Sequence, residues 1–548
     1  MVRTQYKICI FFMLWAVSFL SEAQAQPAHS APGDRMPAEV VTVQGDSVVR
    51  TDTPLFACTS VSTGKIMTLH CPWSESQNAA SLLCLDCRDR VASAWMGFRH
   101  TSGDYRRFQE PEESSRYGFF TNGWSAVGPW RFYGNFSYYN ENSPGTRWAS
   151  IMEPYSGNPY TVGDSVGGDY SREYFLMEGK AALPLTAALA FGFDVKYKAG
   201  VGTKRKDPRP ENTITDFEIS PAFIWSASRW KEGANFRYVT GKEDIGFSSV
   251  TGNKFDLFYF RGLGAFSTTM EDDDRYTQTE LFGGGLQANY GGSLFSNLTS
   301  VSVSRQTTGI KRGSTYPLQV VLLDNYSTEA STLFLFLPEE KDIRRLKLWF
   351  SRSKIYGEEP VVEPKLEEIS WQWATAAKYT LYWHEASRWG AQYAFFRVID
   401  NHHINWGATL AGEYAPEMST YYFVPEFNRQ KISLLNLEAS LEKGFLSRKN
   451  QLVVSLLGGY HTAPSKNLEI VEEKELRQMV HMEFLQHDFD WATADWWEAG
   501  VTADYGRECR VGSISFQFFV EGGFQRVSSD FRGSAARNLF HVNAGINF

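Results

Sequence analysis

Outside its first 25 residues, the 548-residue sequence lacks a long apolar run. A membrane-spanning helix needs about 18 to 20 consecutive apolar residues, so a helical membrane protein is excluded. No long basic run occurs either, and the formal net charge is -8, so the charge pattern does not predict nucleic acid as a partner. In contrast, hydrophobic residues make up 43% of the chain and aromatic residues 15%. This composition excludes general disorder and predicts a large buried core.

The first 25 residues have the pattern of a signal peptide. Arg3 and Lys7 precede the apolar run 8–20, and Ala23-Gln24-Ala25 forms a cleavage site before Gln26. We therefore predict export from the cytoplasm with cleavage after residue 25.

From about Ala92 to Phe548 the chain consists of segments of about 10 residues in which apolar and polar residues alternate. Between Leu189 and Lys198, for example, large apolar side chains alternate with glycine and charged residues. Because successive side chains of a strand point to opposite faces, each segment predicts a strand with one apolar and one polar face.

Tryptophan pairs flank three short polar segments that we predict to be turns. The pairs are Trp124 and Trp130, Trp225 and Trp230, and Trp383 and Trp389. Long polar stretches, such as 140–171 and 461–490, separate these turns. Outer-membrane barrels typically have tight periplasmic turns that alternate with long outer loops, and they carry aromatic residues at their strand ends. We predict that the six tryptophans form an aromatic girdle.

The chain ends on an alternating strand whose last residue is Phe548. A terminal phenylalanine in this setting resembles the signal by which Gram-negative outer-membrane barrels reach their assembly machinery. Residues 92–548, with their aromatic-rich strands and long loops, resemble an uncharacterised family of outer-membrane β-barrel proteins, a domain of unknown function. The resemblance implies a place in the outer membrane of a Gram-negative bacterium, contact with its lipid, and Phe548 as the assembly signal. It implies no substrate.

The sequence thus predicts an all-β fold, a transmembrane antiparallel β-barrel of about 16 strands, within a range of 14 to 18. Even numbers are favoured because both chain ends of such barrels lie in the periplasm. Between Phe255 and Pro364 several apolar runs are either wall strands or parts of loops. A secreted β-sandwich array is the alternative, but it explains neither the tryptophan pairs nor the terminal phenylalanine.

Residues 26–91 differ from the barrel region because they hold four cysteines and little alternation. The cysteines are Cys58, Cys71, Cys84 and Cys87. In the oxidising periplasm they are disulfide candidates with three possible connectivities. A zinc site and an exchangeable thiol pair remain open, since Cys84 and Cys87 have metal-ligand spacing. The segment either enters the lumen as a small hatch or stays in the periplasm, where it docks a partner.

Polar residues opposite the apolar faces are predicted to line the lumen, because the unbroken apolar face must contact lipid. The charged members are Arg131, Asp194, Lys196, Lys198, Asp216, Glu218, Lys231, Arg237, Glu438, Glu442, Glu498, Asp504 and Glu521. Ion pairs across a narrow lumen would close it, whereas solvated charges in a wide lumen would tune its selectivity.

Outside the cysteine segment, no residue pattern predicts catalysis, a metal site or a cofactor. His402 and His403 are adjacent on an extended chain and therefore point opposite ways, and His384-Glu385 lacks the second histidine of a zinc-protease helix. Two function classes remain. One is a channel or transporter for small molecules, and the other is a non-conducting barrel that docks other envelope proteins through its loops or its N-terminal segment.

Overall fold

The computed structural model describes residues 69–85, 91–251, 256–269, 274–292, 295–313, 317–339, 341–367, 370–400, 403–512 and 514–548. The predicted signal peptide lies outside these residues, as do Cys58 and Cys87. None of the described helices is long and apolar enough to cross a membrane.

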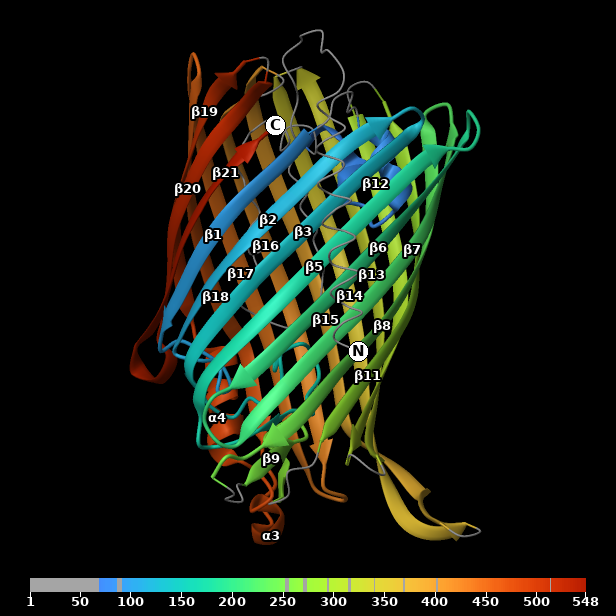
Figure 1. The fold of residues 1–548 in the computed structure, drawn as a ribbon, viewed down its shortest axis with the longest axis vertical. Helices are drawn as coiled ribbons and strands as arrows, with labels where there is room; N and C mark the ends of the chain where they lie inside the picture. The colour runs from blue at the N-terminus through green and yellow to red at the C-terminus, as the bar shows by residue number, and fades with distance from the viewer. Residues whose placement is uncertain are drawn as a thin grey trace. The chain divides into compact units, whose positions relative to one another are not determined.

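Eighteen antiparallel strands of the described residues form one closed sheet (Figure 1). In chain order they are β1 (Val91–Gly103), β2 (Glu113–Val127), β3 (Trp130–Thr146), β5 (Gly168–Pro184), β6 (Leu189–Lys204), β7 (Arg209–Ala227), β8 (Trp230–Ser248), β11 (Arg275–Gly291), β12 (Phe295–Arg312), β13 (Leu318–Glu339), β14 (Asp342–Glu367), β15 (Ser370–Asp400), β16 (His403–Tyr422), β17 (Phe427–Ser447), β18 (Asn450–Glu469), β19 (Trp496–Val511), β20 (Ile514–Ser529) and β21 (Ala535–Asn547).

The sheet closes because β1 pairs with β2 on one side and with β21 on the other. The predicted all-β antiparallel barrel is therefore confirmed, and 18 strands is the upper end of the predicted range and two more than the favoured number. In the difficult region 255–364, the run 257–260 is strand β9, outside the barrel sheet, whereas 318–323 and 333–337 belong to a single wall strand. Wall and loop strands have similar apolar runs, so only the pairing partners separate them.

Large apolar side chains cover the outside of the wall. Met96 and Leu286 are each 69% exposed, and Leu410 is 61% exposed. On β7 the exposed Phe217 and Ile219 flank the buried Glu218, so the apolar and polar faces are those that the alternation predicts. A closed antiparallel barrel with an apolar outer face can satisfy every backbone hydrogen bond in lipid, so we describe this wall as membrane-spanning.

The connections differ in length at the two ends of the barrel. Short connections such as 128–129, 228–229 and 448–449 gather at one end, together with the C-terminus. Long connections gather at the other end, where Figure 1 shows β9, α3 (Lys474–Arg477) and α4 (Met482–Thr493). We call these the inner and the outer end. The predicted alternation of short and long connections is confirmed.

The predicted turn between Trp383 and Trp389 is wrong. Both tryptophans, and His384 between them, lie within β15, which continues to Asp400. Polar residues in this segment suggested a turn, but in the structure they belong to long strands: Glu385 forms an ion pair with Arg352 of the neighbouring strand β14. A charged pair between two strands explains why polar residues are stable there.

The outer end carries a small second sheet. Its strands are β4 (Val162–Gly163), β9 (Leu257–Phe260) and β10 (Phe266–Thr269), which come from two long connections between wall strands. Val162 and Leu257 pack together with Ile245 of the wall, so the small sheet is anchored to the inner face of the barrel.

Deletion of Phe548 is expected to reduce the yield of closed barrel severalfold. The Phe548 amide donates a hydrogen bond to the Ala92 carbonyl at 2.8 Å, and its carbonyl accepts one from the Ala92 amide at 3.3 Å, so this residue forms the last pair of the closing seam. Comparing boiled and unboiled samples on detergent gels measures the folded fraction. Deletion of Val511, which is exposed at the end of β19 and takes no part in the pairing of β1 with β21, is the control, and equal yields of both variants would contradict the prediction.

Candidate functional site

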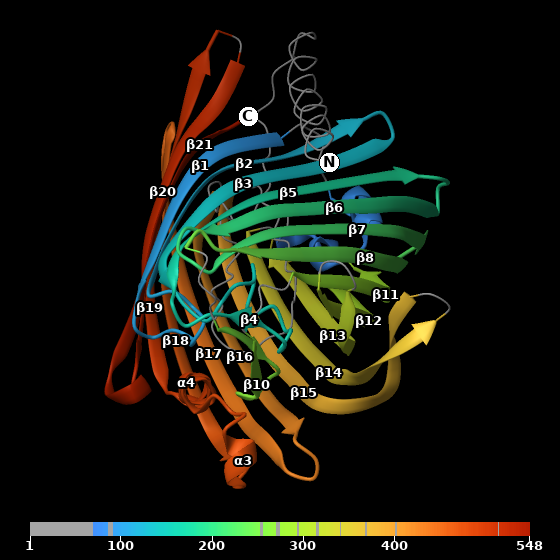
Figure 2. The same cartoon turned by 60° about the horizontal axis from the view of Figure 1, so that its bottom comes forward.

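A short segment of residues 69–85, which we call the inner segment, lies inside the barrel near the inner end (Figure 2). It contains η1 (Pro72–Glu75) and η2 (Ala79–Cys84). Proline at the first position suits the start of η1, and the Asn78 side chain accepts a hydrogen bond from the Ala80 amide at 3.0 Å and so caps η2.

The inner segment packs against the wall along an arc that runs from β2 to β16. Leu82 packs with Trp124 of β2 and Ala182 of β5, and Trp73 and Ala80 pack with residues of β7 and β12. Leu69 packs in a cluster with inward residues of β13 to β16. The segment therefore contacts wall strands that are far apart around the barrel.

Polar contacts fix the same segment. The Trp73 indole donates to Asn289 at 3.1 Å, and the Asn78 amide donates to the Phe223 carbonyl at 3.0 Å. Glu75 forms ion pairs with Arg345 and with Lys347 of β14, the latter at 2.6 Å.

Burial of Glu75 by itself would raise the pKa of its carboxyl group. The adjacent cations Arg345 and Lys347 outweigh burial and lower this pKa below its usual value. Glu75 is therefore ionised at neutral pH, and its attachment to β14 is electrostatic.

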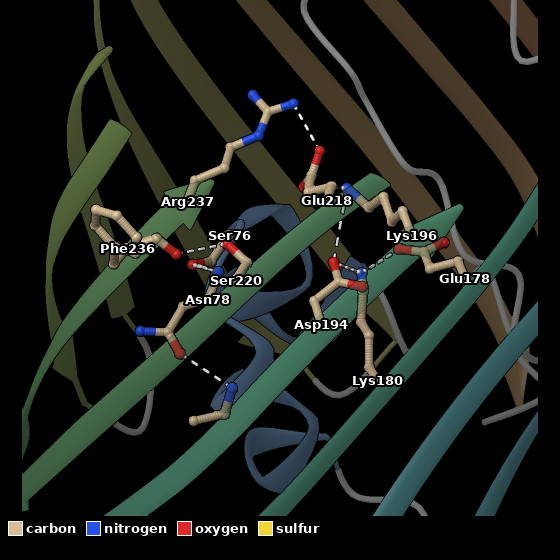
Figure 3. Close-up of polar contacts among 11 residues, drawn as sticks. Ser76, Asn78, Glu178, Lys180, Asp194, Lys196, Glu218, Ser220, Phe236 and Arg237 are labelled. Atoms are coloured by element: carbon tan, nitrogen blue, oxygen red, sulfur yellow. Dashed lines mark hydrogen bonds and ion pairs between the residues drawn. The ribbon is translucent and has the colours of Figure 1, made fainter. Parts of the chain in front are cut away.

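Inward-facing charges of β5 to β8 form a row of alternating sign (Figure 3). Lys180 pairs with Glu178 of its own strand at 3.0 Å and with Asp194 of the next strand at 3.9 Å. Lys196 then bridges Asp194 at 3.6 Å and Glu218 at 3.1 Å.

Arg237 of β8 ends this charged row and contacts Glu218 at 2.8 Å. The recorded partners in the row lie on the same or the adjacent strand. The row therefore joins neighbouring strands along the wall and does not cross the lumen.

Other predicted lumen residues have partners of different kinds. Glu521 accepts a hydrogen bond from Asn543 at 3.0 Å, and Lys198 contacts Asp216 at 3.7 Å and also Glu153 of an outer loop. The rest are buried or half-buried on inward faces, namely Lys231, Glu438, Glu442, Glu498 and Asp504. Arg131 instead donates to carbonyls of the turn beside it, Gly128 and Trp130, and so is not part of the charged row.

The predicted girdle tryptophans do not share one environment. Trp225, Trp230 and Trp389 are 49%, 52% and 58% exposed on the outer face. Trp124 is buried and packs on Leu82 of the inner segment, so its place in a lipid-facing girdle is corrected. Trp130 and Trp383 are half-buried. Trp124 lies an even number of residues from the buried Phe120 on β2, so the two-residue period could have placed it on the lumen side.

The thiols of Cys71 and Cys84 are free in the structure, so the predicted disulfides are not formed at these two positions. The Cys71 sulfur lies 3.4 Å from the Cys84 carbonyl oxygen, and the Lys231 ammonium lies 3.5 Å from the Cys84 sulfur. Burial raises the pKa of both thiols, to about 12 for Cys71. Within the described ranges, His, Cys, Asp and Glu form no group of three suited to a metal ion.

Outer loops fill the lumen at the outer end. Met152 of the loop 147–167 packs against Tyr174 and Ile214 on one side of the wall, and Tyr160 of the same loop packs against Tyr382 on the other side. The loop therefore crosses the lumen.

Helix α4 is attached to this closure through Asp488. Its carboxylate accepts hydrogen bonds from the Phe108 amide at 2.8 Å and from the Tyr155 hydroxyl at 3.4 Å. Burial raises the pKa of Asp488 to about 6, despite these hydrogen bonds. Protonation of Asp488 therefore changes the stability of the outer closure.

The sequence did not single out Glu75, Arg345, Lys347 or Asp488. Arg345 and Lys347 alternate with Leu346 and Leu348, so the same two-residue period could have placed them in the lumen. Glu75 and Asp488 lie in segments without that period, and no local signal distinguishes them.

Comparisons with solved structures find similar barrels at low identity. The chain is similar to the copper transporter OprC (10% identity, 83% of this chain and 80% of that chain, TM-score 0.38). It is also similar to the siderophore receptor PiuA from Acinetobacter baumannii (8% identity, 84% of this chain and 82% of that chain, TM-score 0.35). A third similar structure is the iron transporter FrpB from Neisseria meningitidis (9% identity, 83% of this chain and 82% of that chain, TM-score 0.36). No curated protein matches the chain. One family matches residues 79–548, which include every strand of the barrel, and the chain therefore belongs to this family of unknown function, DUF6850.

Proposed function

We propose that this protein is an outer-membrane transporter for small molecules, whose lumen is gated at the inner end by residues 69–85. The observation that supports it best is the pairing of the charged row within the wall, from Lys180 to Arg237. Because the recorded partners lie on the wall itself, this polar face keeps its ion pairs when the inner segment moves. The exceptions are Arg345 and Lys347 of β14, which pair with Glu75 of the segment, so opening separates these two ion pairs.

The polar attachments of the inner segment are individually weak, whereas its buried Leu69, Trp73 and Leu82 contribute about 1.5 to 3 kcal/mol each. Its ion pairs at Glu75 are partly exposed, and such pairs contribute up to about 1 kcal/mol each. Hydrogen bonds such as that from Trp73 to Asn289 contribute about 0.5 to 1.5 kcal/mol each. The segment is thus held in place without being part of the hydrogen-bonded wall.

Export by a cleaved signal peptide of residues 1–25 and delivery by the barrel-assembly machinery through Phe548 belong to the same proposal. The proposal assigns no catalysis and no cofactor to the chain.

Reversible cross-linking of the inner segment tests the gate. In a chain whose other cysteines are serine, Lys231→Cys places a second thiol on the wall within reach of a bifunctional reagent from Cys84, because the longer native Lys231 side chain brings its ammonium to 3.5 Å from that sulfur. We expect conductance steps in a planar bilayer before linking with a reducible bifunctional thiol reagent, loss of these steps after linking, and recovery on reduction. Lys231→Ser treated identically is the control. Steps that persist at full cross-linking would contradict the gate, and silence in every state would contradict transport.

A docking barrel is the second candidate, and one feature favours it. Strands β14 and β15 continue past their neighbours, so that 359–367 and 370–379 pair only with each other. Figure 1 shows this hairpin projecting from the outer end. If conductance is absent in every state, this hairpin is the first surface to test for an envelope partner.

A further inference from the structure

A pocket with about 80 Å³ of free volume lies at the outer end, between the small loop sheet and the inner faces of β11 to β14. Three arginines line it: Arg261 between β9 and β10, Arg275 at the start of β11, and Arg312 at the end of β12. Glu359 is the only acid among its lining residues in the described part of the chain. The lining therefore has an excess of positive charge.

Arg275 is the unusual member of this group. Its side chain is buried, at 3% exposure, and one guanidinium nitrogen donates to the Tyr160 carbonyl. Its Nε and Nη1 are buried without a hydrogen-bond partner among the described residues. Buried charged donors are costly to leave unpaired, so these groups require an acceptor.

The acids near Arg275 already have other partners. Glu243 interacts with Arg275 electrostatically, but its Oε1 accepts from the Met152 amide at 2.7 Å and from Asn212 at 3.3 Å. Glu359 contacts Arg261 at 2.8 Å and accepts from the Tyr421 hydroxyl at 3.0 Å. Neither carboxylate supplies the hydrogen bonds that Nε and Nη1 of Arg275 lack.

The other two arginines are oriented by neighbours and still line the pocket. Arg261 donates to the Ser267 hydroxyl at 3.0 Å in addition to its ion pair. Arg312 lies over the Tyr259 ring, 4.9 Å from its centre. Planar guanidinium groups that are held in this way are well suited to carboxylate, phosphate and sulfate groups.

We propose that this pocket binds the oxyanion group of a small solute, a carboxylate, phosphate or sulfate. The free volume accommodates one such group together with water. The pocket lies at the end of the barrel that faces the outside of the cell in the proposed topology. The assignment of this anion as a transported solute rests on the proposed function, whereas binding itself does not.

Calorimetry on the purified full-length protein in detergent tests the proposal. Sodium phosphate, sodium sulfate and sodium acetate are titrated at constant ionic strength in sodium chloride. We expect saturable binding of at least one of these anions. Arg312→Gln should weaken it about tenfold, the loss expected for one charge-assisted hydrogen bond. Lys311→Gln is the matched control, because Lys311 is the adjacent cation but is exposed.

Arg275→Gln is the second variant, and detergent-gel migration checks that it folds. The site is supported if the protein binds an anion saturably, if Arg312→Gln and Arg275→Gln weaken this binding, and if Lys311→Gln leaves it unchanged. Absence of saturable binding for all three anions to folded protein, or equal affinity in all variants, overturns it. Binding is measured here without flux, so a silent barrel that still binds an anion would contradict transport and leave the anion site supported.

Discussion

Gly192→Val is expected to release the inner segment from the wall and to make Cys71 reactive. A Cβ atom at Gly192 would lie 2.4 Å from the Ala80 amide nitrogen and 2.6 Å from the Ala79 carbonyl carbon. These are backbone atoms of η2, so the segment itself must move. Valine favours strands, so β6 should remain intact.

The expected effect on Cys71 is large. Burial raises the pKa of its thiol from 9.0 to about 12. Release into water would restore the ordinary value and increase the thiolate fraction up to about a thousandfold, because each pKa unit changes it tenfold. We would measure the rate of maleimide labelling in a chain whose other cysteines are serine.

Gly179→Val is the matched control for this experiment. Gly179 lies on the neighbouring strand β5, and an added Cβ atom there meets no atom within 4 Å. Labelling should remain slow in this variant. A slow rate in Gly192→Val, with normal heat-dependent migration, would show that the inner segment does not rest on the wall at this point.

Asp488→Asn is expected to stabilise the outer closure at pH 8 and to have little effect at pH 4. Burial raises the pKa of Asp488 from 3.8 to about 6. A carboxyl group with a raised pKa does not destabilise the folded state while it is protonated. The free energy of unfolding therefore falls as the pH rises from about 4 to 6 and the group ionises. A difference of about two pKa units corresponds to roughly 3 kcal/mol above pH 6, and asparagine avoids this cost because it stays neutral.

Nearby histidines act in the opposite direction. Burial lowers the pKa of His481 and His487 below 6.5, so each of them destabilises the closure as the pH falls below that value. The wild-type protein and the Asp488→Asn variant both contain these histidines. The difference in protection between the two proteins therefore reports the carboxyl group alone.

Hydrogen exchange of α4, corrected for the intrinsic rate at each pH, is the measurement. The variant should be more protected at pH 8, and the two proteins should converge near pH 4. Equal protection at pH 8 would contradict the assignment of a raised pKa to Asp488. Lower protection of the variant at pH 8 alone would show that the ionised oxygen is needed for the hydrogen bonds from Phe108 and Tyr155.

In strands with clear alternation, such as β7, the sequence by itself determined which face meets lipid. Phe217 and Ile219 are exposed and Glu218 is buried, as a two-residue period requires, since the direction of a side chain depends only on its position along its own strand. The closing terminal strand follows from the same local rule.

Only the tertiary structure decided what depends on residues far apart in the chain. It gave 18 strands, because strand number depends on pairing between distant segments. It placed Trp124 against Leu82, brought Glu75 to Arg345 and left Arg275 without enough acceptors. Each of these results from contacts across the lumen or between loops and wall, which no local period contains.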